Sequence, residues 1–165
     1  MGGAPQREPV VAYIGLGANL GDAAQGVRAA IEAVAGLSGT AVTQRSSLYR
    51  SAPVDAGGPD YVNAVIEVRT LLTAPGLLAD LQRIEQGAGR TRAYRNAPRT
   101  LDLDLLRFGS ASIASDRLTL PHPRMGERAF VLLPLAEIAP HLVPPATLAA
   151  VTSQVIARMA PAADD

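Results

Sequence analysis

Residues 98–109 read PRTLDLDLLRFG and combine an apolar strand pattern with aspartates at positions 102 and 104. Side chains alternate between the two faces of a strand, so the leucines of this stretch are expected on one face. The carboxylates of Asp102 and Asp104 are then neighbours on the other face. Two like charges that close repel each other, and a divalent cation or strong solvation would offset the repulsion. The stretch therefore predicts a strand with a candidate cation site on its polar side.

The segments before this strand alternate between strand and helix patterns. Asp22 can cap the first helix and Pro75 is tolerated in the first turn of the second. The order βαββαβ predicts a ferredoxin-like α+β fold, in which helices cover one face of an antiparallel sheet and leave the opposite face free for a site. The predicted elements are a strand at 10–17 ending in a glycine-rich turn, a helix at 22–37, strands at 40–50 and 61–70, a helix at 75–89, and the aspartate strand.

The last third of the chain predicts C-terminal additions to this fold. Turn residues at 112–120 indicate a short hairpin, residues 129–140 are apolar, and a last helix is expected at 149–159. We expect residues 1–9 to form a flexible N-terminal extension and residues 10–160 to form a single domain.

Composition limits the class of protein. The chain has 165 residues, of which 48% are hydrophobic, enough for a full core. No apolar run approaches the roughly 18 residues that cross a membrane, and the N-terminus lacks a signal-peptide pattern. The absence of cysteine excludes a disulfide framework and thiolate chemistry. We therefore expect a cytoplasmic monomer without a membrane partner.

The distribution of charge is more informative than its sum. A net charge of zero gives no overall attraction for nucleic acid. All 15 basic residues are arginine, which excludes a phosphate-loop lysine, and six of them lie within residues 83–107 around the aspartate pair. The planar fork of arginine suits bidentate phosphate binding, although a solvated basic loop would have the same composition. Arginines beside hard oxygen ligands favour phosphoryl-transfer chemistry.

Two other motifs are less specific. The run GLGANLG at 15–21 follows a strand, but its third glycine is one residue too late for a dinucleotide-binding loop, and the next strand lacks the acidic residue that would hold a ribose. His122 lies between two prolines and is either an ordinary loop histidine or a phosphate contact. Neither histidine has a metal-ligand spacing, so no structural zinc is expected.

Several stretches together resemble one known family. They are AYIGLGANLGD, SSLYRSAPV, PDYVNAVIEV, LQRIEQGAGRTR, APRTLDLDLLRFG and LTLPHPRMGERAFVLLPLAEIAP, in this order between Ala12 and Pro140. The chain resembles the 6-hydroxymethyl-7,8-dihydropterin pyrophosphokinases, folate-pathway enzymes that move pyrophosphate from ATP to a pterin alcohol and release AMP. The resemblance implies a ferredoxin-like fold, ATP as co-substrate and Mg²⁺ as cofactor.

The resemblance also implies a catalytic group around the aspartate strand. Asp102 and Asp104 would bind two magnesium ions that bridge the triphosphate, which would offset the repulsion between the carboxylates. Arg90 and Arg99 would hold the ATP phosphates and stabilise developing charge. The other residues implied to bind the nucleotide are Leu78, Gln82, Glu85, Arg92, Arg117, Thr119 and His122.

A pterin site is implied by the same resemblance. Tyr61 and Phe130 would sandwich the pterin ring, and stacking of this kind adds to simple area burial. Asn63 would read the polar edge of the ring, because its amide supplies both a donor and an acceptor. The backbone that follows the second strand would complete the pattern at Ser51, Ala52 and Val54.

Departures and alternatives accompany this interpretation. Asn96 stands where some relatives carry tryptophan and Pro123 where some carry an aromatic residue, so lid closure and nucleotide affinity are expected to differ.

A ferredoxin-like RNA-binding module is an alternative interpretation. However, the four tyrosines and two phenylalanines supply no paired aromatic platform, and the aspartates would repel phosphate. A magnesium-dependent kinase or hydrolase acting on another alcohol remains open on the residues alone.

Overall fold

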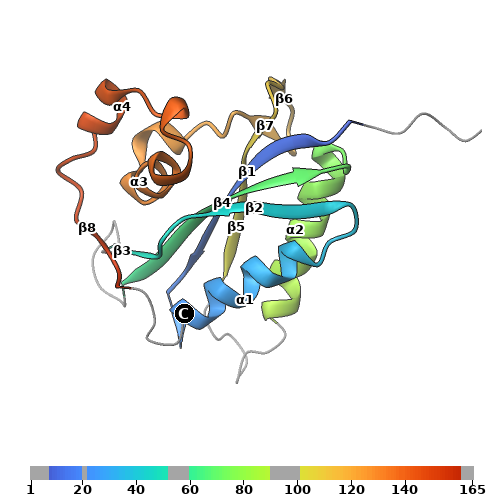
Figure 1. Cartoon of the computed structure of the whole chain (residues 1–165), viewed down its shortest axis with the longest axis horizontal. Coiled ribbons are helices and arrows are strands. Elements are labelled where there is room, and N and C mark those ends of the chain that lie inside the picture. The colour runs from blue at the N-terminus through green and yellow to red at the C-terminus, as the bar shows by residue number, and fades with distance from the viewer. Residues whose placement is uncertain (1–7, 20–21, 52–59, 90–100, 161–165) are drawn as a thin grey trace, which may run out of the picture.

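A computed structural model of the chain places one antiparallel sheet at the centre, with helices against both faces (Figure 1). The structure describes residues 8–19, 22–51, 60–89 and 101–160. Within these ranges the sheet has six strands in the order β5-β1-β4-β3-β8, and β2 also pairs with β4. Its strands are β1 (Val10–Ala18), β2 (Thr40–Arg45), β3 (Tyr49–Ser51), β4 (Tyr61–Thr70), β5 (Asp102–Phe108) and β8 (Ile156–Arg158).

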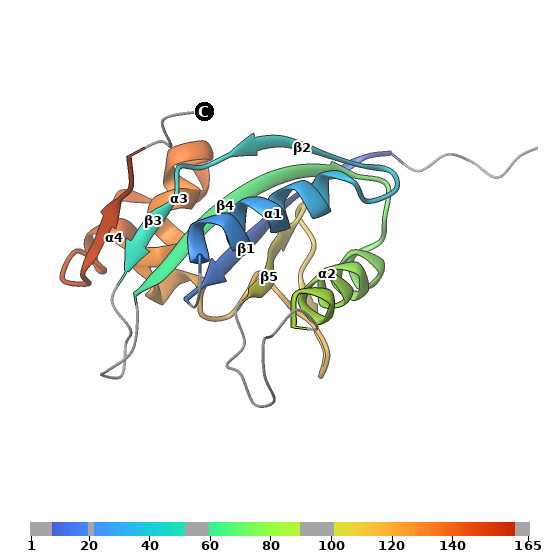
Figure 2. The ribbon, with the colours of Figure 1, turned by 90° about the horizontal axis from the view of Figure 1, so that it is seen from below.

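The remaining elements surround this sheet. A short antiparallel hairpin, β6 (Ile113–Ala114) and β7 (Thr119–Leu120), follows β5. Figure 2 shows α3 and α4 at the end of the sheet that carries β3 and β8, and α2 at the end that carries β5. The helices are α1 (Ala23–Ala35), α2 (Ala74–Gly89), α3 (Ala129–Ile138) and α4 (Pro145–Ala149).

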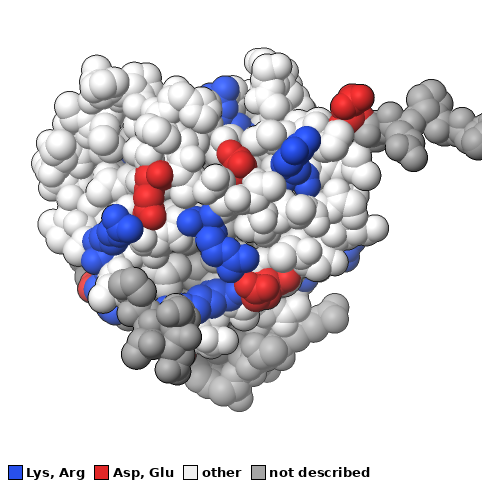
Figure 3. Space-filling view, viewed as in Figure 1, with Lys and Arg blue, Asp and Glu red and all other residues white. Residues whose placement is uncertain are grey.

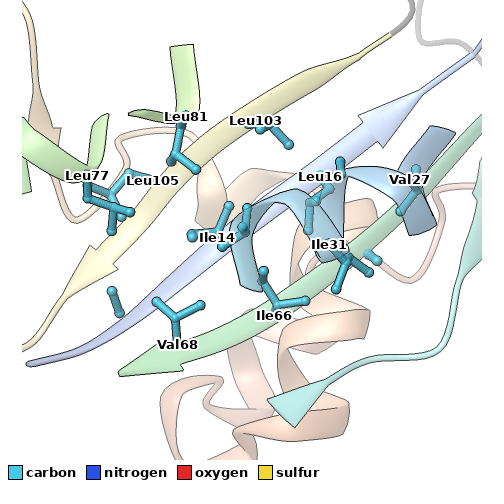
Figure 4. Close-up of a cluster of buried hydrophobic side chains, with 14 of the residues drawn as sticks. Ile14, Leu16, Val27, Ile31, Ile66, Val68, Leu77, Leu81, Leu103 and Leu105 are labelled. Carbon is cyan, nitrogen blue, oxygen red and sulfur yellow. The ribbon is translucent and has the colours of Figure 1, made fainter. Parts of the chain in front are cut away.

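The larger core lies between the sheet and the helices α1 and α2, as Figure 4 shows. As predicted, the side chain of Asp22 caps α1 by accepting from the backbone N–H of Gln25 at 3.1 Å. Helix α2 begins at Ala74, one residue before Pro75. The buried side chains that meet here are Ile14 and Leu16 from β1, Ile66 and Val68 from β4, Leu103 and Leu105 from β5, Val27 and Ile31 from α1, and Leu77 and Leu81 from α2.

A second core occupies part of the opposite face. Helix α3 packs its apolar residues Val131, Leu132 and Leu135 against Tyr13 of β1 and Val65 of β4. The expectation that the face opposite α1 and α2 would be free is therefore wrong for this part of the sheet. The sequence 129–138 is apolar except for Glu137, which suits a helix that is largely covered by neighbours rather than one with a broad solvated face.

Strand β5 follows the predicted alternation at its start and then breaks it. Leu103 and Leu105 are buried beneath α2, whereas Asp102 is exposed and Asp104 is half-buried. The register against β1 shifts between Tyr13 and Ile14, which leaves Leu106 without a partner across the strands. This bulge turns the side chain of Leu106 into the α3 core.

The strand expected at 10–17 is confirmed as β1, which runs one residue further, to Ala18. Two other sequence predictions fail, each because a tertiary contact prevails over local pattern. The expected strand 40–50 is two strands, because Ser46 turns its hydroxyl to the backbone N–H of Val65 at 3.0 Å. The expected helix 149–159 is instead the end of α4 and strand β8, which pairs with β3.

Replacing Leu106 by alanine should lower the free energy of unfolding by about 2–5 kcal/mol, because it empties a fully buried site between β1 and α3. Urea denaturation followed by circular dichroism measures the loss. Leu71→Ala is the control, since Leu71 is 44% exposed and should change stability by less than about 1 kcal/mol. Equal losses in the two variants would contradict the packing role of the bulge.

Candidate active site

A cavity of about 250 Å³ lies between β5, α2 and the β6–β7 hairpin. It brings together five residues that the sequence resemblance placed at the nucleotide site, although they come from distant parts of the chain. These residues are Leu78, Asp104, Arg117, Thr119 and His122. The cavity thus combines two carboxylates, one guanidinium and one imidazole beside apolar side chains, a mixture suited to a ligand that has both polar and apolar parts.

The other residues of the cavity were not foreseen, except Pro123, which the sequence comparison with relatives had singled out as a departure. Leu103 and Leu105 reach it from β5, and the hairpin adds further polar and apolar side chains. No charge cluster or spacing in the sequence distinguishes these positions from ordinary strand and turn residues. The additional lining residues from the hairpin and the turn after it are Ser115, Asp116, Leu118 and Pro123.

A row of residues crosses the sheet beside this cavity. Asp102 of β5 lies opposite Gly17 of β1, and Gly17 lies opposite Asn63 of β4. Residues directly opposite each other project from the same face of a sheet. Two strand spacings of about 4.8 Å put the backbones of Asp102 and Asn63 roughly 10 Å apart. The sheet therefore brings a residue of the proposed metal site and a residue of the proposed pterin site onto one surface.

Gly17 keeps the space between these two residues open. A Cβ atom at this position would lie 2.9 Å from Oδ1 of Asn63, closer than packed atoms approach. Asn63 is buried, and its Nδ2 donates to Oγ of Ser51 at 2.9 Å. The amide is consequently held in one orientation, with its oxygen over a strand position that has no side chain.

His122 is held as a neutral hydrogen-bond donor. Its backbone N–H donates to the carbonyl of Leu106 at 2.9 Å, and its Nδ1 accepts from the N–H of Arg124 at 3.2 Å. Burial lowers the pKa of His122, and the nearby Arg128 and Arg124 lower it further, while Asp104 opposes them. Since Nδ1 accepts, the neutral ring carries its proton on Nε2. That nitrogen can donate to an oxygen of a ligand in the cavity.

Glu85 has an unforeseen contact with the aspartate strand. Its Oε2 accepts a hydrogen bond of 2.6 Å from the backbone N–H of Leu103, the residue between Asp102 and Asp104. The sequence resemblance implied a nucleotide contact for this residue and gave no indication of the bond to β5. Gln82, one turn earlier on α2, is exposed.

The two aromatic residues expected to stack on a ring lie in neighbouring elements. Tyr61 begins β4 and is half-buried, and Phe130 lies in the first turn of α3, which packs on β4. The guanidinium of Arg128 sits 5.4 Å from the centroid of the Phe130 ring. A cation over one face of this ring stabilises its position.

Part of the predicted site lies outside the described residues. These positions are Ala52, Val54, Arg90, Arg92 and Arg99. The departure at Asn96 falls in the same range. Their roles therefore remain predictions from the sequence.

The donor set fits a magnesium ion that arrives with a phosphate ligand. Across the described ranges, no group of three acidic, histidine or cysteine side chains is arranged to hold a metal ion. Two carboxylates on one face of β5 remain, and Mg²⁺ usually binds one or two carboxylates together with substrate phosphates and waters. Asp102 and Asp104 thus match a site that is completed by its ligand.

A second polar cluster anchors strand β3, which leads to Ser51. Glu137 of α3 accepts from the backbone N–H of Ser47 at 3.0 Å and from the hydroxyl of Tyr49 at 2.8 Å, and Arg158 of β8 lies 3.5 Å away. Burial and this bond raise the pKa of Tyr49 to about 12, so its phenol remains a donor. Burial alone would raise the pKa of Glu137, but the bonds from Tyr49 and Ser47 and the charge of Arg158 hold it below its usual value.

The face that carries α1 has both basic and acidic side chains. Basic and acidic side chains are interspersed there rather than gathered into a continuous basic surface (Figure 3). In the described part of the chain, no helix is both long and apolar enough to cross a membrane.

Comparison with known proteins identifies the family. The model of the 7,8-dihydro-6-hydroxymethylpterin-pyrophosphokinase (HPPK) family matches residues 13–140, well over half of the chain. The chain belongs to the HPPK family. The match spans the β1–β5 sheet, the cavity and α3, so the whole of the described site lies inside it.

Individual relatives agree. The chain is 47% identical over 137 residues to the 2-amino-4-hydroxy-6-hydroxymethyldihydropteridine pyrophosphokinase of Haemophilus influenzae, covering 82% of this chain and 86% of the relative. The enzyme of the same name from Bacillus subtilis is 42% identical over 140 residues, covering 84% of each chain. A crystal structure of Plasmodium falciparum HPPK-DHPS shares the fold, with a TM-score of 0.66 at 14% identity over 83% of this chain. The chain spans only 42% of that solved protein.

Glu137→Gln should lower the free energy of unfolding by about 1–3 kcal/mol at neutral pH, because charge-assisted hydrogen bonds to β3 are lost. A lowered pKa in the folded state means that this contribution is present above the usual value of 4.5 and disappears as the pH falls through the folded value. Urea denaturation of the wild type and of Glu137→Gln between about pH 7 and pH 3 should therefore show that the difference in their free energies of unfolding decreases as the pH falls. Glu32→Gln, at an exposed pair with Arg45, is the control and should change stability little. A difference that is constant with pH would contradict the assignment.

Proposed function

We propose that this chain is a 6-hydroxymethyl-7,8-dihydropterin pyrophosphokinase, which transfers pyrophosphate from ATP to the pterin hydroxymethyl group and releases AMP in folate biosynthesis. Membership of the HPPK family supports the reaction. The observation that carries the proposal for this chain's own site is the row Asp102, Gly17, Asn63, because these residues share one face of the sheet and this supports two adjacent half-sites. ATP and two magnesium ions are the proposed co-substrate and cofactor.

The cavity is the proposed nucleotide site. Leu78 would contact the adenine, and Arg117, Thr119 and His122 would bind the ribose and phosphates, since all four line the cavity with Asp104. Asp102 and Asp104 would hold magnesium against the triphosphate, with Arg90, Arg92 and Arg99 as further phosphate donors. Magnesium bound there would neutralise phosphate charge and make the β-phosphorus more electrophilic.

The surface around Asn63 is the proposed pterin site. The fixed amide of Asn63 would pair with the polar edge of the pterin, beside the backbone from Ser51 to Val54. Tyr61 and Phe130 would stack on the ring. Asn63 lies about two strand spacings from Asp102, which supports a pose in which the hydroxymethyl group would extend over Gly17 toward the triphosphate.

This arrangement supports an in-line transfer. The hydroxyl oxygen of the pterin would form a bond to the β-phosphorus while the bond to the bridging oxygen of AMP breaks, and the hydroxyl proton would pass to solvent. The chain would contribute by holding both reactants at a fixed separation and by presenting preorganised donors to the phosphates.

Finer features of the fold belong to the same proposal. A ferredoxin-like classification is supported by the antiparallel strand pairs and by the order of the elements along the chain, which is β1, α1, β2 with β3, β4, α2 and β5. A monomer, a cytoplasmic location and the absence of nucleic-acid and membrane partners remain predictions.

Asp102→Asn and Asp104→Asn should each lower kcat on the order of 10²- to 10³-fold, because each removes a charged magnesium ligand from the transition state. AMP release that depends on hydroxymethyldihydropterin measures the reaction, and circular dichroism should remain native. Asp22→Asn, which keeps a good helix cap, is the matched control with unchanged kcat. Near-normal turnover of either site variant at saturating magnesium would remove that residue from the metal site.

The same assay tests the substrate. AMP release with other alcohols in place of the pterin would favour the alternative function, a kinase or hydrolase that acts on another alcohol.

Gly17→Ala should weaken pterin binding about tenfold, because the new methyl group displaces the Asn63 amide, worth roughly one lost hydrogen bond. Isothermal titration with hydroxymethylpterin, in the presence of magnesium and a non-hydrolysable ATP analogue, measures the effect. Binding of the ATP analogue alone should change little. Gly26→Ala in α1 is the control, since the nearest atom to its new Cβ lies 4.0 Å away. Unchanged pterin affinity would show that Asn63 does not read the pterin.

A further inference from the structure

Glu85 occupies a position on α2 where the helical pattern calls for an apolar side chain. It follows Leu77 and Leu81 at four-residue steps, and both leucines are fully buried against the sheet. Glu85 itself is half-buried. A carboxylate in such a place is costly unless it is hydrogen-bonded. Its position near the C-terminal end of α2 adds to the cost, because the helix dipole disfavours negative charge there.

The hydrogen bond from Leu103 offsets this cost. At 2.6 Å between the backbone nitrogen and Oε2, it has the short length expected when the acceptor is charged. Strand β5 ends the strand order, and its described pairing is with β1. In an antiparallel pair, alternate N–H groups point away from the partner strand. The Leu103 N–H is one of these, and Glu85 binds it from the outer edge of the sheet.

This bond acts at the centre of the proposed metal site. Leu103 separates Asp102 from Asp104, so fixing its backbone fixes the strand that carries both carboxylates. β1 restrains the inner edge of the strand through the pairs of Asp102 with Gly17 and Asp104 with Gly15. Glu85 supplies the restraint on the outer edge. A metal site requires its ligands to be held within about 0.5 Å of the productive geometry, which a strand held on one side alone does not guarantee.

A direct role in metal binding is less consistent with the geometry. Glu85 does not join Asp102 and Asp104 in any three-residue cluster that could hold a metal ion within the described chain. Nor does it line the cavity in which four of the other predicted nucleotide residues meet, namely Leu78, Arg117, Thr119 and His122.

We propose that Glu85 is a positioning residue for the aspartate pair: its carboxylate holds the Leu103 backbone so that Asp102 and Asp104 face the magnesium–triphosphate at a fixed separation. This inference rests on the proposed function for its catalytic consequence. The hydrogen bond itself can be tested in the ligand-free protein.

Three variants separate the roles of charge, hydrogen bonding and burial. Glu85→Gln keeps an oxygen acceptor without the charge, and Glu85→Leu removes the acceptor while continuing the apolar stripe of α2, so both should fold. Gln86→Leu is the matched control, because Gln86 is the exposed neighbour on the same helix. Circular dichroism and thermal unfolding verify the fold of each.

The first measurement is NMR of the Leu103 amide proton without ligand. In the wild type and in Gln86→Leu, this proton should resonate downfield and exchange slowly with D₂O. In Glu85→Leu it should shift upfield and exchange at least tenfold faster, with Glu85→Gln between the two. An unchanged Leu103 amide in Glu85→Leu would overturn the proposal whether or not the chain transfers pyrophosphate.

The second measurement is the magnesium dependence of binding and turnover. Glu85→Leu should need about 10- to 100-fold more Mg²⁺ for tight binding of a non-hydrolysable ATP analogue, the usual effect of losing an outer-shell partner, and kcat should fall in the same range. Glu85→Gln should recover most of both. Weaker binding of the analogue to Glu85→Leu even without Mg²⁺ would indicate a direct nucleotide contact and overturn the positioning role. A normal magnesium dependence in Glu85→Leu, measured together with a released Leu103 amide, would also overturn the positioning role. If wild-type protein binds the analogue with magnesium but transfers nothing to the pterin, the proposed function fails while these binding results still decide the role of Glu85.

Discussion

The pairing of β1 with strands on both of its sides is the constraint on which the site depends. β1 hydrogen-bonds to β4 along its whole length and to β5 along most of it. These two ladders set which residues of three separate chain segments stand side by side. β1 contributes Gly15 and Gly17 to the polar face of the sheet, so the functional side chains there come from the neighbouring strands β4 and β5. Leu106 fills the space over Gly15, and the Asn63 amide occupies the space beside Gly17.

The polar groups of the site are stabilised by contacts from the scaffold. Carboxylates from two helices hold strand backbones: Glu85 of α2 accepts from Leu103, and Glu137 of α3 accepts from Ser47. The first bond is made to β5 and the second to the segment between β2 and β3, next to strands that carry proposed ligand-binding residues. Among the described residues, every buried side-chain nitrogen or oxygen has a hydrogen-bond partner. Because unpaired buried polar groups cost about 1–3 kcal/mol each, this complete pairing favours a single arrangement of the site.

Local sequence patterns predicted the elements that have strong periodicity. The helix from Ala23, the cap at Asp22, the strand Tyr61–Thr70 and the alternation at Asp102 follow from residue spacing alone. The patterns failed where a partner far along the chain decides the structure, as at Ile156–Arg158, which is a strand because β3 is beside it. The roles suggested for Leu78, Arg117, Thr119 and His122 came from the family resemblance, and their meeting in one cavity depends on tertiary packing that spacing does not encode. The bond between Glu85 and Leu103 carries no signal in the sequence beyond a charge on an apolar stripe.

The pairing of β8 with β3 has a consequence for how the sheet is completed. Residues 156–158 lie beside residues 49–51, so this contact joins segments about a hundred positions apart. During synthesis, the earlier strands can pair while the outer edge of β3 still exposes its backbone groups, a surface that readily pairs with other chains. The edge is covered only after the final strand emerges from the ribosome, and the bonds of Arg158 to Ser47 and Glu137 then secure it. The β3 side of the sheet, next to the proposed pterin site, is thus the last part to be protected against aggregation.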